Sequence, residues 1–424
     1  MTLKYWRLAF GLAILQGILL YIRISETWFT SDDFVNFEIV QLKSFGWDYL
    51  TYSAYFQIVP GFRLFYTIYW HLFGLNFNGF IGFALLLSAA STIAFVAVGY
   101  RLGLDETLVG CGGLLYVGLP QQLSSYLWMT AALHEMPALC AVLWAIYVLL
   151  GEKPRSRFWG AALYGVSLLF TPKAVFGVLF ISVLLTHKYL MQGCDIKKAA
   201  RKTMVTMLWF VPVLALYAPA FHKMTGAGSY LGAYLSTQLG FMARAYSEGT
   251  IATTFGLGLI GPHRYATRSM VAAAVLGVAL IAALGVRADK RKRVLWAGLF
   301  VYVGLAMFSI CLQRAWVEGE LGGATSRYNV HNAVFLLIVL MLTLAAVTSK
   351  VGKAMIVVVT MAVALNVYVQ RDNVYYGWMR PQIVKYFVHN YQISGIPSGV
   401  VHKEVMWAWM RPYNEARLFN LLLK

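Results

Sequence analysis

Residues 79–99 read GFIGFALLLSAASTIAFVAVG, a stretch of twenty-one residues without a charged side chain. A helix needs about 20 apolar residues to cross the hydrocarbon core of a bilayer, so this stretch predicts a transmembrane helix. The whole chain has the same character, with 60% hydrophobic and 12% charged residues. A soluble domain is nearer to about half apolar and about a quarter charged. Most of the 424 residues therefore belong in a membrane.

Clusters of Lys and Arg separate the apolar stretches and indicate which ends face the cytoplasm. With a cytoplasmic N-terminus, about half of the 35 Lys and Arg residues fall in short cytoplasmic loops, which is the bias typical of membrane proteins. The net charge of +18 therefore reflects membrane topology, and we expect no nucleic acid partner. The apolar stretch at residues 8–22 is not followed by a small-residue cleavage site, so we interpret it as a retained first helix.

This threading predicts an all-α polytopic membrane protein with about eleven transmembrane helices. Residues 58–74 mix Arg63 and His71 with aromatic side chains and predict an interfacial helix in the first outer loop. The chain then divides into a transmembrane module, 1–370, with long outer loops at 25–78 and 222–268, and a small extracytoplasmic cap, 371–424. The spans are expected at 6–24, 79–99, 105–121, 136–151, 158–171, 174–190, 203–221, 269–286, 294–312, 329–348 and 354–370.

Cysteine and histidine spacing gives no sign of a disulfide framework or a metal site. The four cysteines are scattered and form no CxxC pair. We therefore expect no cofactor and no obligatory metal. The chain has no N-x-Ser/Thr sequon and no retention signal, which favours a bacterial cytoplasmic (inner) membrane.

Two adjacent carboxylates, Asp32 and Asp33, follow the first apolar segment in the stretch ETWFTSDDFVNFEIVQ, residues 26–41. In one interpretation they complement the dipole of a helix capped by Thr30 or Ser31. A cap needs only one acid, however, so the pair favours a catalytic role. None of the 17 acids falls in the middle of a predicted span, which disfavours an ion-coupled transporter.

Further polar residues lie at predicted outer ends, and each has a structural alternative to a binding role. His134 and Glu135 are candidate substrate ligands, or they cap a helix expected to start near Pro137. Lys173 binds substrate or extends to the membrane surface from a helix end. Arg264 and Arg268 bind substrate or anchor to headgroups. A solvated loop is the preferred interpretation of the remaining set, Arg314, Glu318 and Glu320.

The order of these motifs resembles the GT-C glycosyltransferases, a class of polytopic enzymes that use lipid-phosphate-linked sugars outside the cytoplasmic membrane. The resemblance covers about residues 1 to 350. The matching stretches are TSDDF in the first outer loop, YWHLFGLNFNGF after it, TAALHEMP, LLFTPKAVFG with Lys173, and GATSRYNVHN with Arg327 and Tyr328. The chain differs from better-known members because it lacks a large C-terminal soluble domain, which leaves acceptor recognition open.

The resemblance implies inverting transfer of a sugar from a polyprenyl-phosphate donor to an acceptor hydroxyl on the extracytoplasmic face. Asp32 or Asp33 is then the general base, because an attacking hydroxyl needs a carboxylate to take its proton. Arg327 is the first candidate for the leaving phosphate, since a guanidinium can hold it with two parallel bonds, and Tyr328 adds a donor. The partners implied are the lipid-linked donor, membrane lipids, and a glycan, lipid or protein acceptor.

Two other classes remain open. A transporter or lipid-linked glycan flippase shares the hydrophobic architecture, but the sequence shows no matching halves. A lipid-glycan polymerase or ligase would use the same parts to move a whole glycan. The sequence alone does not separate this last class from a monosaccharide transferase.

Overall fold

The structure is a computed structural model that describes residues 1–25, 27, 29, 31–52, 58–74, 76–151, 153–225, 235–257 and 268–369. Every regular element in this part of the chain is helical, which confirms the predicted all-α class. The predicted cap, 371–424, lies outside the described residues, as do parts of the second outer loop.

The described residues of the first half of the chain form ten α-helices and one short 3-10 helix, η1. Their bounds are α1 Leu3–Ile24, α2 Ser31–Leu42, α3 Trp47–Leu50, α4 Pro60–Phe73, α5 Phe77–Arg101, α6 Glu106–Val117, α7 Pro120–Tyr126, α8 Met129–Leu149, α9 Pro154–Leu168, η1 Pro172–Phe176 and α10 Gly177–Met191.

The part of the second half that the structure describes adds seven α-helices and four helical segments of other kinds, among them the π-helix η3. Their bounds are α11 Ile196–Met207, η2 Leu208–Phe210, α12 Val211–Thr225, α13 Leu235–Arg244, η3 Ala245–Ala252, α14 Arg268–Ala288, α15 Lys292–Glu318, η4 Gly319–Ala324, η5 Ser326–Asn329, α16 Val330–Leu344 and α17 Lys350–Val369.

Seven helical stretches in the described residues are long and apolar enough to cross a membrane. One of them, α14, exposes Leu276, Leu280 and Leu284 by 58–68%, a stripe at four-residue spacing that suits lipid and not water. The chain is therefore a helical membrane protein, and the number of crossings stays a prediction. The seven stretches are Leu3–Ile24, Phe77–Arg101, Met129–Leu149, Pro172–Met191, Ile196–Ala218, Ser269–Ala288 and Lys292–Leu312.

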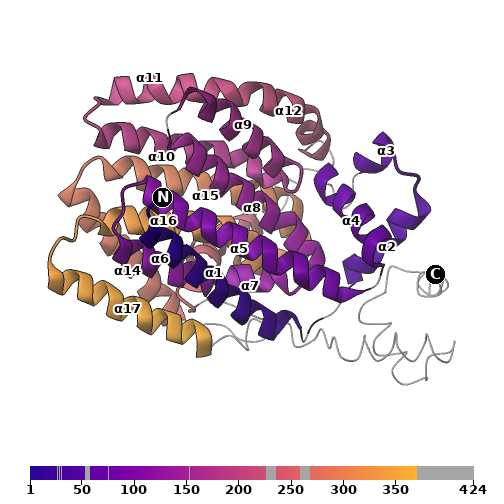
Figure 1. The fold of residues 1–424 in the computed structure, drawn as a ribbon, viewed down its shortest axis with the longest axis horizontal. Coiled ribbons are helices and arrows are strands. Elements are labelled where there is room, and N and C mark those ends of the chain that lie inside the picture. Colours follow the sequence, from indigo (N-terminus) through magenta and orange to yellow (C-terminus); the bar gives the residue numbers. More distant parts are fainter. Residues whose placement is uncertain are drawn as a thin grey trace.

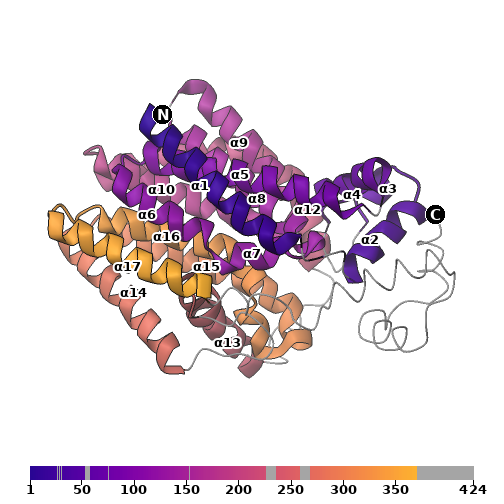
Figure 2. The ribbon, with the colours of Figure 1, turned by 60° about the horizontal axis from the view of Figure 1, so that its bottom comes forward.

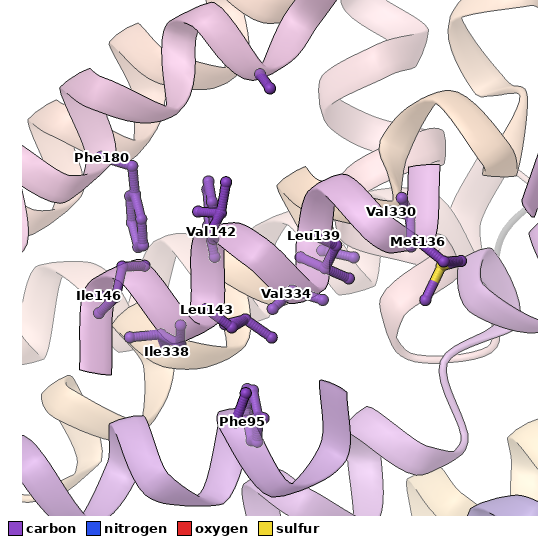
Figure 3. Packing of buried hydrophobic residues seen from close by; sticks show 14 of the residues in the cluster. Phe95, Met136, Leu139, Val142, Leu143, Ile146, Phe180, Val330, Val334 and Ile338 are labelled. Atoms are coloured by element: carbon purple, nitrogen blue, oxygen red, sulfur yellow. The ribbon is translucent and has the colours of Figure 1, made fainter. Parts of the chain in front are cut away.

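Helix α8 is the central helix of the bundle. About 72% of the residues in its most apolar stretch are buried, against 11% of those in the corresponding stretch of α14. Val142 and Ile146 of α8 lie near Phe180 of α10 and Ile338 of α16, and Phe95 of α5 lies on the other side (Figure 3). Close packing of this kind fixes the position of α8 against several neighbours.

The three short helices α2, α3 and α4 lie together at one end of the bundle, next to the end of α1 (Figures 1 and 2). An aromatic cluster joins them to α5, since the ring of Phe29 lies edge-on to Phe37 of α2 and Phe77 of α5 at centroid distances of 5.1 and 5.0 Å. The predicted helix at 58–74 is thus confirmed as α4. Its place at the membrane interface stays a prediction.

The predicted cytoplasmic cations make contacts that agree with the threading. Lys188 of α10 donates a hydrogen bond to the carbonyl oxygen of Leu150, just after the C-terminal end of α8. Lys353 of α17 lies 2.7 Å from Asp105, which precedes α6.

All eleven predicted spans overlap helical segments, but the predicted start of the span at 136–151 is wrong. The helix expected to start near Pro137 begins at Met129, so Pro137 lies inside α8. Proline removes one backbone hydrogen bond, a loss that tightly packed membrane helices tolerate. As a result His134 and Glu135 are helical residues, and Glu135 lies within a candidate span. The expectation that no acid falls in the middle of a span stays a prediction, because Glu135 is the seventh of the 21 residues of this candidate span.

Topology is testable with two single cysteines in a background without native cysteines. Ser44 and Thr348 are both exposed, and the threading places Ser44 outside and Thr348 in the cytoplasm. In intact cells, an impermeant thiol reagent is expected to label Ser44→Cys and to reach Thr348→Cys only after lysis. Labelling of Thr348→Cys from outside would reverse the orientation.

Candidate functional site

Asp33 anchors α2 to the beginning of α8. Its Oδ1 atom accepts hydrogen bonds from the backbone N–H of Thr130 at 2.8 Å, the Thr130 hydroxyl at 2.7 Å and the Tyr66 hydroxyl of α4 at 2.8 Å. Thr130 is the second residue of α8, where backbone N–H groups have no partner inside the helix. A carboxylate there satisfies that N–H group and complements the helix dipole. The Asp33 side chain is fully buried, so it ties three helices together.

A buried arginine extends this cluster. Arg63 of α4 donates from Nη1 to the side-chain oxygen of Asn36 at 2.8 Å, and Asn36 of α2 donates in turn to the Thr130 hydroxyl at 3.3 Å. The carbonyl oxygen of Arg63 accepts a hydrogen bond from the Tyr49 hydroxyl at 3.0 Å. Burial raises the pKa of Tyr49, which keeps this hydroxyl protonated. We name Asp33, Asn36, Arg63, Tyr66 and Thr130 the acid-loop cluster.

Glu135 and Lys173 form a buried ion pair. Lys173 Nζ lies 2.5 Å from Glu135 Oε2 and donates a second hydrogen bond to the carbonyl oxygen of Tyr328 at 2.9 Å. His331 of α16 places Nε2 at 3.2 Å from the Glu135 carbonyl oxygen and 3.5 Å from Oε2. The side chains of Glu135, Lys173 and His331 are 9%, 6% and 2% exposed. We name Glu135, Lys173 and His331 the buried clamp.

His134 connects the two clusters. Its Nδ1 atom lies 3.0 Å from the carbonyl oxygen of Phe170, after α9, and its ring stacks on Phe62 of α4 with centroids 4.1 Å apart. Thr130 and Glu135 are five residues apart on α8, a rise of about 7.5 Å. One end of a single helix therefore carries the acid-loop cluster, His134 and the buried clamp.

A polar network holds the segment that follows Arg327. Asn329 donates to the carbonyl oxygens of Gly323 and Thr325, both at 3.0 Å, and its side-chain oxygen accepts from Thr250 of η3 and from Asn332 at 3.0 Å each. The turn η5 is therefore fixed at Asn329 by this network and at Tyr328 by Lys173.

The structure brings together some of the site residues predicted from sequence, while others lie outside the residues that it describes. Asp33, His134, Glu135, Lys173 and the backbone of Tyr328 meet at one end of α8. The side chains of Asp32, Arg268 and Arg327, and all of Arg264, lie outside the described residues. Arg314 and Glu318 belong to the end of α15 and Glu320 to η4, so the loop predicted there is wrong.

Sequence reasoning missed Asn36, Tyr66, Thr130 and His331. Their only sequence signal is polarity in apolar surroundings, as with Arg63 in the run 58–74. Among the residues that the structure describes, no three His, Cys, Asp or Glu side chains gather as metal ligands. Comparison with known protein families, with curated proteins and with solved structures finds no match to this chain.

Proposed function

We propose that this chain is a membrane glycosyltransferase that moves a sugar from a polyprenyl-phosphate donor to an acceptor hydroxyl on the extracytoplasmic face. One observation carries the proposal. The helix of the acidic pair is attached to α8 through Asp33 and Thr130, and the Arg327–Tyr328 turn is attached to α8 through Lys173 and Glu135. Acidic and basic motifs nearly 300 residues apart in sequence thus converge on two turns of one helix.

In this proposal the two aspartates have different roles. The Oδ1 atom of Asp33 already accepts three hydrogen bonds in a fully buried position, which suits a positioning residue. Asp32 is therefore assigned the role of general base. The acceptor oxygen forms a bond to the anomeric carbon, its proton passes to the Asp32 carboxylate, and the bond between that carbon and the phosphate oxygen breaks.

The leaving group is a lipid phosphate that gains negative charge. Arg327 is assigned its first contact, with Arg264 and Arg268 as further candidates, since fixed guanidinium groups stabilise a phosphate without a metal. The donor lipid lies in the bilayer, which accounts for an enzyme composed mostly of membrane helices. The proposal includes eleven spans and a GT-C-like arrangement. A polymerase or ligase of the same architecture would transfer a whole glycan by the same steps.

A transporter or flippase is the second candidate, and one observation favours it. Glu135 and Lys173 are buried ionisable groups inside candidate membrane helices, where such groups often mark a transport path, and His331 lies beside them in the shorter apolar helix α16. The π-helix η3 lies beside the turn they hold, since Thr250 of η3 binds Asn329. Irregular helices of this kind also occur in transporters.

Purified protein in liposomes separates the two candidates. With a polyprenyl-phosphate sugar and a mixture of acceptor glycans and lipids, we expect release of polyprenyl phosphate together with a glycosylated product. A flippase would move a fluorescent lipid-linked sugar between leaflets and leave its sugar–phosphate bond intact. Movement without bond cleavage would replace the transferase proposal.

A further inference from the structure

The buried clamp has a role that its sequence motifs do not reveal. We infer that Glu135, Lys173 and His331 position the Arg327–Tyr328 turn, and that Lys173 acts through this turn and does not itself bind the donor phosphate. The reference to a donor phosphate rests on the proposed function. The positioning of the turn does not, and it is tested separately below.

The contacts of Lys173 argue against a direct phosphate contact. An ammonium group has three protons, and here one points to the Glu135 carboxylate at 2.5 Å and another to the Tyr328 carbonyl oxygen at 2.9 Å. The side chain is only 6% exposed. A phosphate that approached Lys173 would also approach the carboxylate of Glu135, which repels it. The sequence position of Lys173 alone suggests a phosphate ligand, whereas its contacts suggest that it holds the Tyr328 backbone in place.

The same contacts explain how the turn is held. Tyr328 follows Arg327 directly within the four-residue element η5, so a hydrogen bond to the Tyr328 carbonyl oxygen fixes the peptide group between Tyr328 and Asn329, one residue after Arg327. Glu135 orients the ammonium group that makes this bond. His331, three residues after Tyr328, contacts the Glu135 backbone and holds the start of α16 on α8.

A single cysteine measures the position of the turn without any assay of activity. Thr325 precedes η5 and is half-buried, and Thr325→Cys in a background without native cysteines reports access by an impermeant thiol reagent. Lys173→Met is expected to raise the labelling rate about tenfold, since a bond from a charged donor is lost. Lys173→Arg, which keeps charge and donors, is expected to retain most of the protection.

A double variant separates positioning from a simple charge defect. Lys173→Met alone takes the neutralising ammonium group away from the buried carboxylate of Glu135, which by itself destabilises a protein. Glu135→Gln with Lys173→Met removes both charges but still lacks the bond to Tyr328. We expect this double variant to fold and to label as fast as Lys173→Met. Wild-type protection in the double variant would overturn the inference.

Transfer rates provide the second test. If Lys173 acts through the turn that carries Arg327, then Lys173→Met slows transfer strongly in the wild type but by less than about threefold in an Arg327→Lys background. If Lys173→Met slows transfer by the same factor in the wild type and in the Arg327→Lys background, Lys173 contacts the donor independently of Arg327, which contradicts the inference. If the wild type transfers no sugar, the proposed function fails while the labelling result still decides the role of the clamp.

Discussion

Asp32→Asn is expected to abolish sugar transfer while the protein stays as stable as the wild type. An asparagine cannot take the proton of the attacking hydroxyl, and loss of a general base costs about 100- to 10,000-fold in rate. The stability should persist because the anchor of α2 is Asp33, not Asp32. Transfer rates in liposomes and the Tm of the purified variant check both parts.

Asp33→Asn serves as the matched comparison. It removes the charge from a buried group with three donors on Oδ1, and a hydrogen bond to a charged group contributes roughly 1.5–3 kcal/mol. We expect a lower Tm together with slower transfer. Thr130→Val removes one of these donors, leaves both acids, and should lower Tm in the same direction. If Asp32→Asn transfers normally and Asp33→Asn is inactive at unchanged Tm, the two roles are reversed.

Arg327→Ala is expected to lower the transfer rate by about 100-fold or more. A charge-assisted contact formed at the leaving phosphate contributes roughly 2–4 kcal/mol to the transition state, whereas a headgroup anchor contributes about 0–1 kcal/mol. Arg327→Lys should recover only part of the rate, because an ammonium group cannot make two parallel bonds to a phosphate. The rates are compared at matched amounts of protein in the membrane.

Arg155→Ala is the control for this substitution. Arg155 is an exposed arginine of α9 in a predicted cytoplasmic loop, so its loss should leave transfer within about threefold of wild type. Rates for Arg327→Ala in that same narrow range would remove Arg327 from the site.

The helices of this fold were predictable because apolar length is a local signal. The runs around residues 79–99 and 269–286 correspond closely to α5 and α14. The start of α8 was not predictable, since Pro137 normally marks a helix boundary. Here Asp33, 97 residues away from Thr130, satisfies an N–H group in the first turn and the helix begins at Met129.

The ion pair between Glu135 and Lys173 could not be predicted from the sequence for a similar reason. Glu135 and Lys173 each looked like an outer-end polar residue, and no local pattern shows that one neutralises the other. Lys173 and Tyr328 are 155 residues apart, and Glu135 and His331 are 196 apart. Sequence reasoning could identify charged residues near the outer ends, but not which charges meet.

The central place of α8 has a mechanical consequence. From Met136 to Ile146 its side chains lie among those of α5, α10 and α16, so the helix moves with the body of the bundle (Figure 3). The acid-loop cluster and the Arg327–Tyr328 turn are both attached to its first two turns. A change in bilayer thickness that tilts the bundle should therefore carry both parts along as one rigid piece and preserve the spacing between them.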